Sequence, residues 1–204
     1  MLKRFLFAVA AMAVCSTGVF AQDLFLNFGD GTTSTQELSE GSGTVGIYAR
    51  NGFDFSAAEF SFTSSDTSVA SFTGGTGLNP AVGPFGDRFD VDPTVETTSA
   101  DGSTGRFIGV GILGLGVASV FSAFDPTFDA ELDAFLLGTV EYDLVGPGQV
   151  EFGLEASGNG VLSGGVLVDP AFAGASLTVE AIPEPSSAIL LALGFAGFAA
   201  RRRR

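Results

Sequence analysis

Residues 137–154 read LGTVEYDLVGPGQVEFGL, with an apolar side chain at every second position on both sides of the turn Gly146-Pro147-Gly148. The alternating apolar positions are Val140, Tyr142, Leu144, Val150, Phe152 and Leu154. Successive side chains of a β-strand point to opposite faces of its sheet, so this alternation indicates strands with one buried face. The segment therefore predicts two strands joined by a turn.

The same alternation extends over most of the chain between residues 22 and 181. It recurs at Leu24, Leu26 and Phe28, at Val45, Ile47 and Ala49, at Phe60 and Phe62, at Leu177 and Val179, and within residues 106–112. Turn sequences separate these runs at Asp30-Gly31, Asn51-Gly52, Gly74-Gly75, Asp101-Gly102 and Asn159-Gly160. Short strands at this spacing predict an all-β fold, a sandwich or a barrel. No internal repeat divides the segment, so we expect residues 22–181 to form a single domain.

Two segments fit the strand pattern less well. Residues 126–134 begin with Pro126 after Asp125, which favours a short helix with Asp125 as its N-cap, although the same residues could form an acidic loop. Residues 76–104 contain Pro80, Pro84 and Pro93 together with several aspartates. We expect long surface loops there.

The N-terminus has the features of an export signal. Lys3 and Arg4 are followed by an apolar run over residues 5–14, and Val19-Phe20-Ala21 forms a small-residue cleavage site. We therefore predict that residues 1–21 are a signal peptide. The general secretion machinery would export the chain, and signal peptidase would cut between Ala21 and Gln22.

Cys15 offers an alternative, because lipoproteins are cut before a cysteine that then carries lipid. Val14 precedes it where a small residue is expected, so we favour ordinary cleavage. Removal of residues 1–21 then removes the only cysteine and the only lysine. The mature body could form neither disulfides nor Lys–Asn isopeptide bonds, so its stability must come from a hydrophobic core.

The C-terminus has three elements in a fixed order. Pro183-Glu184-Pro185 is extended and stiff, residues 188–200 are uniformly apolar, and Arg201, Arg202, Arg203 and Arg204 end the chain. A helix over the apolar run would be roughly 20 Å long, shorter than the ~30 Å hydrocarbon core of a bilayer. The arginines should remain cytoplasmic. We therefore expect a short transmembrane helix that contacts the membrane until processing; an ordinary tail anchor, usually ~20 residues long, is the alternative.

These three elements resemble the PEP-CTERM sorting signal of Gram-negative bacteria. Ile182 stands where the motif often has valine, and the resemblance covers residues 182–204 alone. It implies recognition by an exosortase-type membrane protease at Pro183, Glu184 and Pro185, with the terminal arginines as the cytoplasmic stop. It also implies transient anchoring in the inner membrane and delivery to the outer surface or the exopolysaccharide matrix.

The chain between Gln22 and Ala200 is strongly acidic. It holds all 23 acidic residues and three cations, Arg50, Arg88 and Arg106, which gives a net charge of −20 at pH 7. A nucleic-acid partner or an anionic lipid surface would require a cationic patch, so neither is expected. Self-repulsion that maintains solubility is a sufficient explanation of this charge. Alternatively, divalent cations could bridge the carboxylates to an acidic polysaccharide.

Catalytic motifs are weak. The absence of histidine excludes Ser-His-Asp and Cys-His sites, and zinc sites built on histidine or cysteine are excluded in the mature body. Carboxylate pairs could hydrolyse a glycosidic bond, but no pair is singled out by its spacing. The glycines at 109, 111 and 114 have dinucleotide-binding spacing, which has meaning only in a βαβ unit, so a Gly-rich strand is favoured. We expect no enzyme activity.

Calcium is the one cofactor that the acidic residues suggest. Asp87, Asp90 and Asp92 form one group, and Asp125, Asp129, Glu131 and Asp133 form a second. Loop carboxylates suit calcium, and Asp87, Asp90, Asp92, Asp125 and Asp129 are the candidate ligands. Neither group matches the Asp-x-Asp-x-Asp-Gly calcium loop, so solvated acidic loops are the favoured alternative.

The order of features in the body resembles cohesin-like and related carbohydrate-binding jelly rolls. Residues 45–49 would be an early strand, and residues 52–55 followed by 59–62 resemble the pair that crosses the sandwich. Residues 137–142 and 148–152 resemble the later strands. The resemblance implies a single β-sandwich of jelly-roll or cohesin-like type, flanked by the signal peptide and the short C-terminal helix.

Two functions follow as hypotheses. The first is a non-enzymatic surface or matrix protein that is exported, sorted through residues 182–204 and associated with exopolysaccharide in a biofilm. The second is an adhesive module of cohesin-like type that recognises a particular glycan or protein. A simple tail-anchored protein is a third possibility, and it predicts an intact C-terminus.

Overall fold

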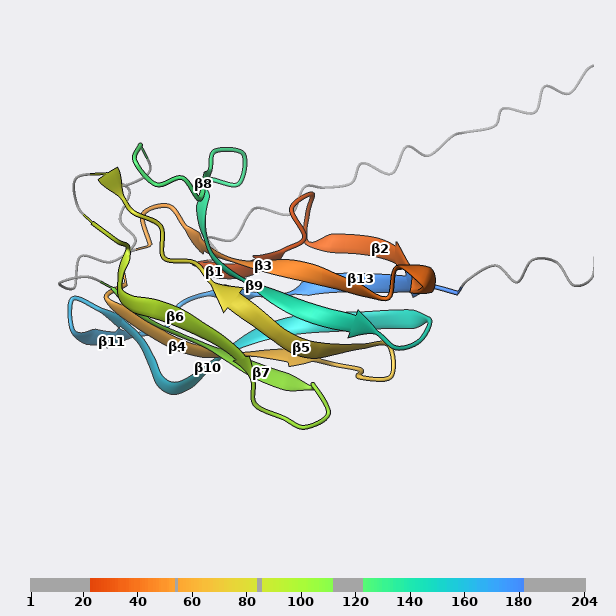
Figure 1. Cartoon of the computed structure of the whole chain (residues 1–204). Helices are drawn as coiled ribbons and strands as arrows, with labels where there is room; N and C mark the ends of the chain where they lie inside the picture. The colour runs from red at the N-terminus through yellow and green to blue at the C-terminus, as the bar shows by residue number, and fades with distance from the viewer. Residues whose placement is uncertain (1–22, 54, 84–85, 112–122, 182–204) are drawn as a thin grey trace, which may run out of the picture.

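Two β-sheets packed face to face form the body of the chain (Figure 1). This computed structural model describes residues 23–53, 55–83, 86–111 and 123–181. The predicted signal peptide with its Ala21/Gln22 cleavage site, the sorting segment 182–204 and Gly114 lie outside the described residues. The prediction of an all-β chain with a single β-sandwich is confirmed.

Sheet A has six strands in the order β12-β1-β3-β9-β5, with β8 paired to β9. Its strands are β1 (Leu24–Asn27), β3 (Ser42–Arg50), β5 (Ala70–Gly77), β8 (Phe128–Asp129), β9 (Ala134–Leu144) and β12 (Phe172–Ala173). The long pair of β3 and β9 is antiparallel and forms the centre of this sheet.

Sheet B has seven strands in the order β2-β13-β10-β4-β7-β6, with β11 paired to β10. Its strands are β2 (Thr33–Glu37), β4 (Ala57–Ser64), β6 (Phe89–Thr97), β7 (Thr104–Gly111), β10 (Gly148–Ser163), β11 (Val166–Val168) and β13 (Ala175–Glu180). A short 3-10 helix, η1 (Leu38–Glu40), follows β2.

Aromatic side chains fill the space between the sheets. Phe62 of β4 meets Phe72 of β5 edge to face at 5.0 Å between ring centroids, and Tyr142 of β9 meets Phe152 of β10 at 5.1 Å. Each fully buried phenylalanine contributes about 1.5–3 kcal/mol through the hydrophobic effect. The apolar residues at every second position are thus the core-forming ones.

The structure decides between the expectations for the two irregular segments. Residues 126–134 form a loop that contains β8 and leads into β9, and not the short helix that was the other possibility. The prediction of loops throughout 76–104 was wrong, because residues 89–97 form β6. Pro93 falls at a register irregularity between Val91 and Thr94, on the last strand of the sheet, where a missing N–H removes no ladder hydrogen bond.

Gly109 and Gly111 lie in β7, as the Gly-rich strand interpretation predicts. Within the described residues, no helix has the length and apolar character that crossing a bilayer requires. The apolar run 188–200 lies outside them.

Candidate functional site

The candidate calcium ligand Asp125 is buried and already paired. Its Oδ2 accepts a 2.9 Å hydrogen bond from Nε of Arg88 and a second from Nη2. Its Oδ1 accepts from the backbone N–H and the hydroxyl of Thr127, both at 2.8 Å. Burial lowers the pKa of the Arg88 guanidinium, and the hydrogen bond and charge of Asp125 oppose that shift. Each oxygen of the Asp125 carboxylate therefore already accepts two hydrogen bonds, and a cation lies beside it. It is not available to coordinate a calcium ion.

The other candidate ligands are scattered. Oδ1 of Asp129 accepts the backbone N–H groups of Glu131 and Leu132, at 2.8 and 3.0 Å. Asp92 accepts from the side chain of Asn79 at 3.1 Å, on another part of the surface. Asp87 and Asp90 are exposed. Across the described ranges, no three acidic side chains gather into a group that could hold a metal ion, so calcium stays a prediction.

The outer face of sheet B carries a row of apolar side chains. Val91 of β6 lies opposite Val110 of β7, Val110 opposite Ala57 of β4, Ala57 opposite Leu162 of β10, and Leu162 opposite Leu167 of β11. Residues directly opposite each other in adjacent strands share a face of the sheet. These five residues, called the apolar row below, therefore form one line across five strands.

The apolar row faces solvent. Ala58 and Val161, each next in the chain to a member of the row, are buried in the core, so the row points the other way. Val91, Val110 and Leu167 are 72%, 48% and 65% exposed. Ala57 and Leu162, which lie between them in the row, are half-buried. Single exposed apolar residues are common on proteins, whereas an apolar row shared by five neighbouring strands indicates an interaction surface.

A chain of polar side chains runs beside the apolar row. Glu59 accepts hydrogen bonds from the backbone and side-chain nitrogens of Asn159, at 3.1 and 2.9 Å. Nη1 of Arg106 lies 4.0 Å from Glu59, and Nη2 of Arg106 lies 2.6 Å from Glu96. Arg106 is thus held by two carboxylates.

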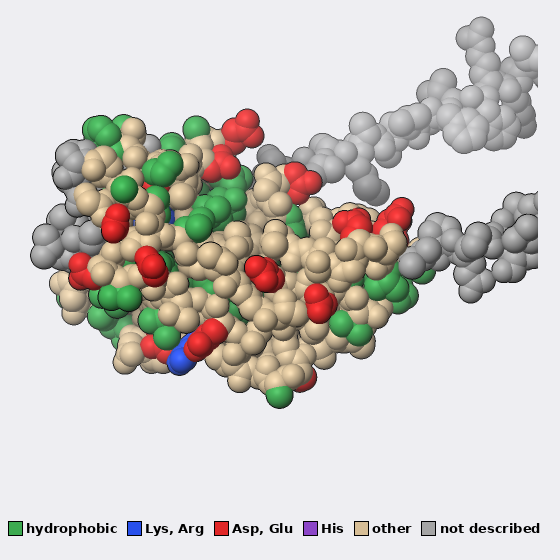
Figure 2. Space-filling model, in the orientation of Figure 1, with side chains coloured by type: hydrophobic (Ala, Val, Ile, Leu, Met, Phe, Trp, Pro, Cys, Tyr) green, Lys and Arg blue, Asp and Glu red, His purple; other side chains and the backbone are tan. Residues whose placement is uncertain are grey.

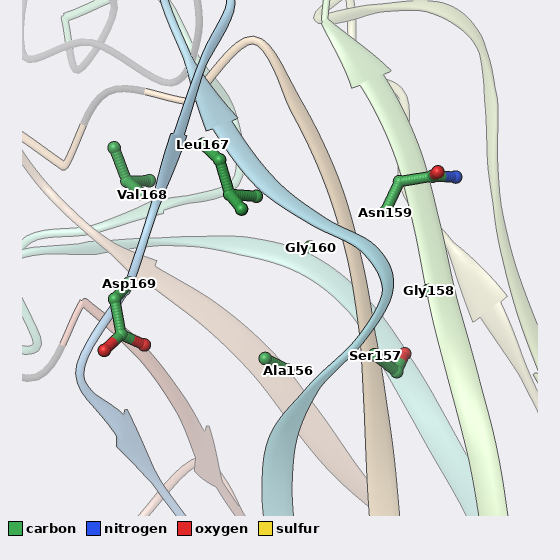
Figure 3. Close-up of a pocket in the computed structure, with 8 residues that line it drawn as sticks. All are labelled: Ala156, Ser157, Gly158, Asn159, Gly160, Leu167, Val168 and Asp169. Atoms are coloured by element: carbon green, nitrogen blue, oxygen red, sulfur yellow. The ribbon is translucent and has the colours of Figure 1, made fainter.

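An open pocket of about 520 Å³ lies at one end of the apolar row, where β10 bulges (Figure 3). The register of β10 against β4 shifts between Ala156 and Val161. Residues 156–160 line one side of the pocket and residues 167–169 of the β11 segment line the other. The hydroxyl of Ser157 is buried there with no hydrogen-bond partner.

Sequence reasoning did not identify this surface. The alternation rule finds the buried side of a strand, whereas Val91, Val110 and Leu167 occupy the opposite side. Their alignment depends on strand order and on the bulge in β10, which local patterns do not specify. The surface offers apolar contact and paired charges, which suit the binding of a partner.

Comparisons with known proteins address the two parts of the chain separately. Residues 181–204 match the family model described as the PEP-CTERM protein-sorting motif. This motif implies an exported protein that an exosortase sorts. The sequence matches no curated protein.

The body is similar in fold to solved cohesin structures. The sixth cohesin of scaffoldin B from Acetivibrio cellulolyticus, in complex with a dockerin, has a TM-score of 0.50 and 10% identity over 78% of this chain and 99% of that one. A non-cellulosomal cohesin from the archaeon Archaeoglobus fulgidus has a TM-score of 0.48 and 8% identity, covering 78% and 91%. A Clostridium perfringens cohesin module from a family 33 glycoside hydrolase has a TM-score of 0.46 and 11% identity, covering 79% and 98%. At these identities the likeness concerns the fold alone. The chain thus carries a PEP-CTERM sorting motif behind a β-sandwich body that resembles cohesin modules.

Proposed function

We propose that this chain is a non-enzymatic protein of the outer surface or extracellular matrix. Signal peptidase removes residues 1–21, residues 22–181 form the working domain, and an exosortase-type membrane protease recognises Pro183, Glu184 and Pro185. The protein is then retained with exopolysaccharide. One observation carries this proposal: the sorting motif begins at residue 181, directly after β13, which ends at Glu180.

The geometry of the sandwich supports this arrangement. The end of β13 pairs with the first residue of β10, Gly148. The apolar row crosses β10 at Leu162, near its other end, roughly 40 Å away along the strand. Figure 1 shows β11 and β8 at one end of the sandwich and the end of β13 at the other. A chain held in the membrane by residues after β13 would therefore present the apolar row and the segment around β8 away from the bilayer.

The charge of the described surface is consistent with a protein that is located outside the membrane. Acidic side chains are scattered over the visible face with very few basic ones among them (Figure 2). Such a surface repels anionic lipid and keeps the protein soluble.

The test is intact-mass analysis of the protein from fractionated producing cells. The proposal expects a mature N-terminus at Gln22, a C-terminus shortened within residues 182–204, and recovery from the outer surface or matrix. Replacing Pro183, Glu184 and Pro185 together by alanine should hold the chain in the inner membrane. The matched control replaces Ser186 and Ser187 by alanine and should be sorted normally. Wild-type protein found in the inner membrane with Arg204 attached would overturn the proposal.

A second candidate function, an adhesive module that binds a protein partner, is favoured by the apolar row. Cohesins of the same fold have been solved in complex with dockerins. Here the partner would bury Val110 and Leu167 and present an apolar surface of its own. Val110→Glu with Leu167→Glu should abolish capture of matrix proteins by the purified chain. Thr94→Glu, which adds charge to the same face beside the row, should leave capture intact; equal capture by all three proteins would reject this candidate.

A further inference from the structure

A hollow lies on the outer face of sheet A, on the opposite side of the molecule from the apolar row. It has a volume of about 490 Å³, within the range of roughly 300–1,000 Å³ typical of small-molecule sites. Its lining comes from the sheet, through Tyr48 and Leu136, and from residues 126–131. Figure 2 shows hydrophobic side chains at the bottom of a depression beside the β8 loop, with acidic side chains at its rim.

The floor of the hollow is a small apolar cluster separate from the main core. Phe25 and Tyr48 stack with 5.5 Å between ring centroids and 16° between planes, and both are more than nine-tenths buried. The Tyr48 ring lies over Gly46, since a Cβ there would come within 2.5 Å of Tyr48 Cε2 and 2.9 Å of Leu136 Cδ1. A glycine thus makes room for a flat aromatic floor.

Residues 125–133, here called the strap, cross this floor and are fastened at both ends. At one end Asp125 binds Arg88, as described above, and the hydroxyl oxygen of Thr127 accepts a hydrogen bond from Nη2 of Arg88. At the other end the backbone N–H and the side-chain amide of Asn51 donate to Asp133, both at 2.9 Å. Asp133 has a φ of +48°, the one positive φ among the described non-glycine residues. Because both ends are fixed, the hollow exists before any ligand arrives, which reduces the entropic cost of binding.

Two polar groups of the hollow have atoms without a partner in the described structure. The Tyr48 hydroxyl makes no hydrogen bond within the described structure, and Asp129 has a second carboxylate oxygen, Oδ2, without a partner. Burial, and secondarily the charge of Asp129, raises the pKa of Tyr48, so the phenol stays neutral and able to donate or accept. Glu131 adds a second carboxylate. Arg50 does not line the hollow, but its guanidinium lies 5.3 Å from the centre of the Phe25 ring and donates to the carbonyl oxygen of Leu132 in the strap.

We propose that this hollow binds an amino-sugar residue with a free ammonium group, as part of a polysaccharide, an inference that rests on the proposed function for its polymer. The apolar face of the sugar ring would lie against Tyr48, Phe128 and Leu136, and its ammonium would pair with Asp129 and Glu131. Its hydroxyls would satisfy the Tyr48 hydroxyl. An ammonium beside aromatic rings gains cation–π attraction as well as the ion pair.

The charge and the shape of the hollow favour an amino sugar over acidic glycans and over a lysine side chain. The net charge of −20 and the two carboxylates repel uronic acids and phosphorylated glycans. A lysine side chain carries the right charge but is a narrow chain, which would leave much of the 490 Å³ unfilled and the flat floor only partly covered. A pyranose ring covers that floor and supplies donors in several directions.

The test is calorimetric titration of the protein recovered from producing cells with four probes. These are a glucosamine oligomer, the fully N-acetylated oligomer of the same length, a neutral glucose oligomer, and oligolysine. The proposal expects measurable binding of the glucosamine oligomer. The acetylated and glucose oligomers should bind at least about tenfold more weakly, because a charge-assisted hydrogen bond is lost. Oligolysine should also bind more weakly than the glucosamine oligomer, because its narrow side chain leaves the flat floor partly uncovered.

Variants locate the binding. Asp129→Asn retains the oxygen that accepts from the strap backbone, so folding is preserved while the charge is lost. Together with Glu131→Gln it should weaken glucosamine-oligomer binding by about tenfold or more. Glu155→Gln, a charge loss on sheet B, is the matched control and should bind normally. Equal affinity for the acetylated oligomer, tighter binding of oligolysine, or unchanged affinity in the double variant would each overturn the proposal.

Discussion

Arg88 and Asp125 form an ion pair that is buried at the point where the strap joins the sandwich, with side chains 4% and 1% exposed. Nη1 of Arg88 also donates to the carbonyl oxygen of Leu136 at 2.8 Å, and its guanidinium lies 5.6 Å from the centre of the Phe135 ring. One arginine therefore ties the start of β6 to the strap and to β9. The pair positions the hollow on sheet A although neither residue lines it.

Loss of Asp125 should destabilise the fold strongly. Asp125→Ala leaves a buried guanidinium without its counterion, which typically costs about 3–5 kcal/mol in the free energy of unfolding. Urea unfolding followed by circular dichroism measures this. Glu96→Ala, which breaks the exposed pair with Arg106, is the control and should cost less than about 1 kcal/mol.

The double variant Arg88→Met/Asp125→Leu separates burial of charge from packing. Removing both charges together should recover much of the stability lost in Asp125→Ala, because apolar replacements avoid the desolvation of a lone ion. A double variant as unstable as Asp125→Ala would show that the hydrogen bonds to Thr127 and Leu136 carry the stability instead.

Gly46 should tolerate no side chain while Tyr48 occupies its present position. In Gly46→Ala the new methyl group collides with the Tyr48 ring, and overpacking of this kind costs about 1–3 kcal/mol. Gly74→Ala is the matched control on another strand of sheet A, because its Cβ would meet no atom within 4 Å. Equal melting temperatures of the two variants would contradict the described floor of the hollow.

The phenol of Tyr142 should lose its proton at a higher pH than an exposed tyrosine does. Burial raises its pKa to about 12, the charge of Glu40 adds to the shift, and the hydrogen bond to Gln36 opposes it. Between pH 10 and 12 the unfolded chain loses this proton while the folded chain keeps it, so stability falls as the pH rises through that window.

The chain has two tyrosines and no tryptophan, so ultraviolet difference spectroscopy reports Tyr48 and Tyr142 alone. Tyr142→Phe should make the alkaline loss of stability shallower. A wild-type titration in which both phenols ionise at pH 10 would contradict the burial of these rings.

The strands were predictable because burial on one face imposes a period of two on the sequence, as in residues 140–144 and 150–154. The β6 strand was missed because Pro93 and register irregularities interrupt that period. The candidate surfaces depend on longer-range geometry. The apolar row requires the order β6-β7-β4-β10-β11, and the hollow requires residues 125–133 to fold back over Tyr48. A local pattern carries no information about which strands become neighbours.

The acidic residues predicted as calcium ligands should bind no calcium. Asp125 is paired with Arg88, and among the described residues no three acidic side chains lie close enough together to hold a metal ion. We therefore expect the melting midpoint to stay unchanged when EDTA is added and then excess calcium. A midpoint that falls with EDTA and rises with calcium would restore the calcium interpretation, since a ligand that binds the folded state stabilises it.

Gly158 should be the residue on which the bulge in β10 depends most. It has a φ of +54°, and a Cβ there would come within 1.9 Å of Glu59 Oε1. Gly158→Ala therefore combines backbone strain with displacement of the carboxylate that binds Asn159.

Gly164→Ala separates the two effects, because Gly164 has a φ of +56° and a Cβ added there would meet no atom within 4 Å. The control should lose about 1–2 kcal/mol from the left-handed backbone alone, and Gly158→Ala should lose clearly more in urea unfolding. If the two variants lose the same amount, the contact between Glu59 and the bulge contributes nothing, and the pocket beside Leu167 is held open by the backbone conformation only.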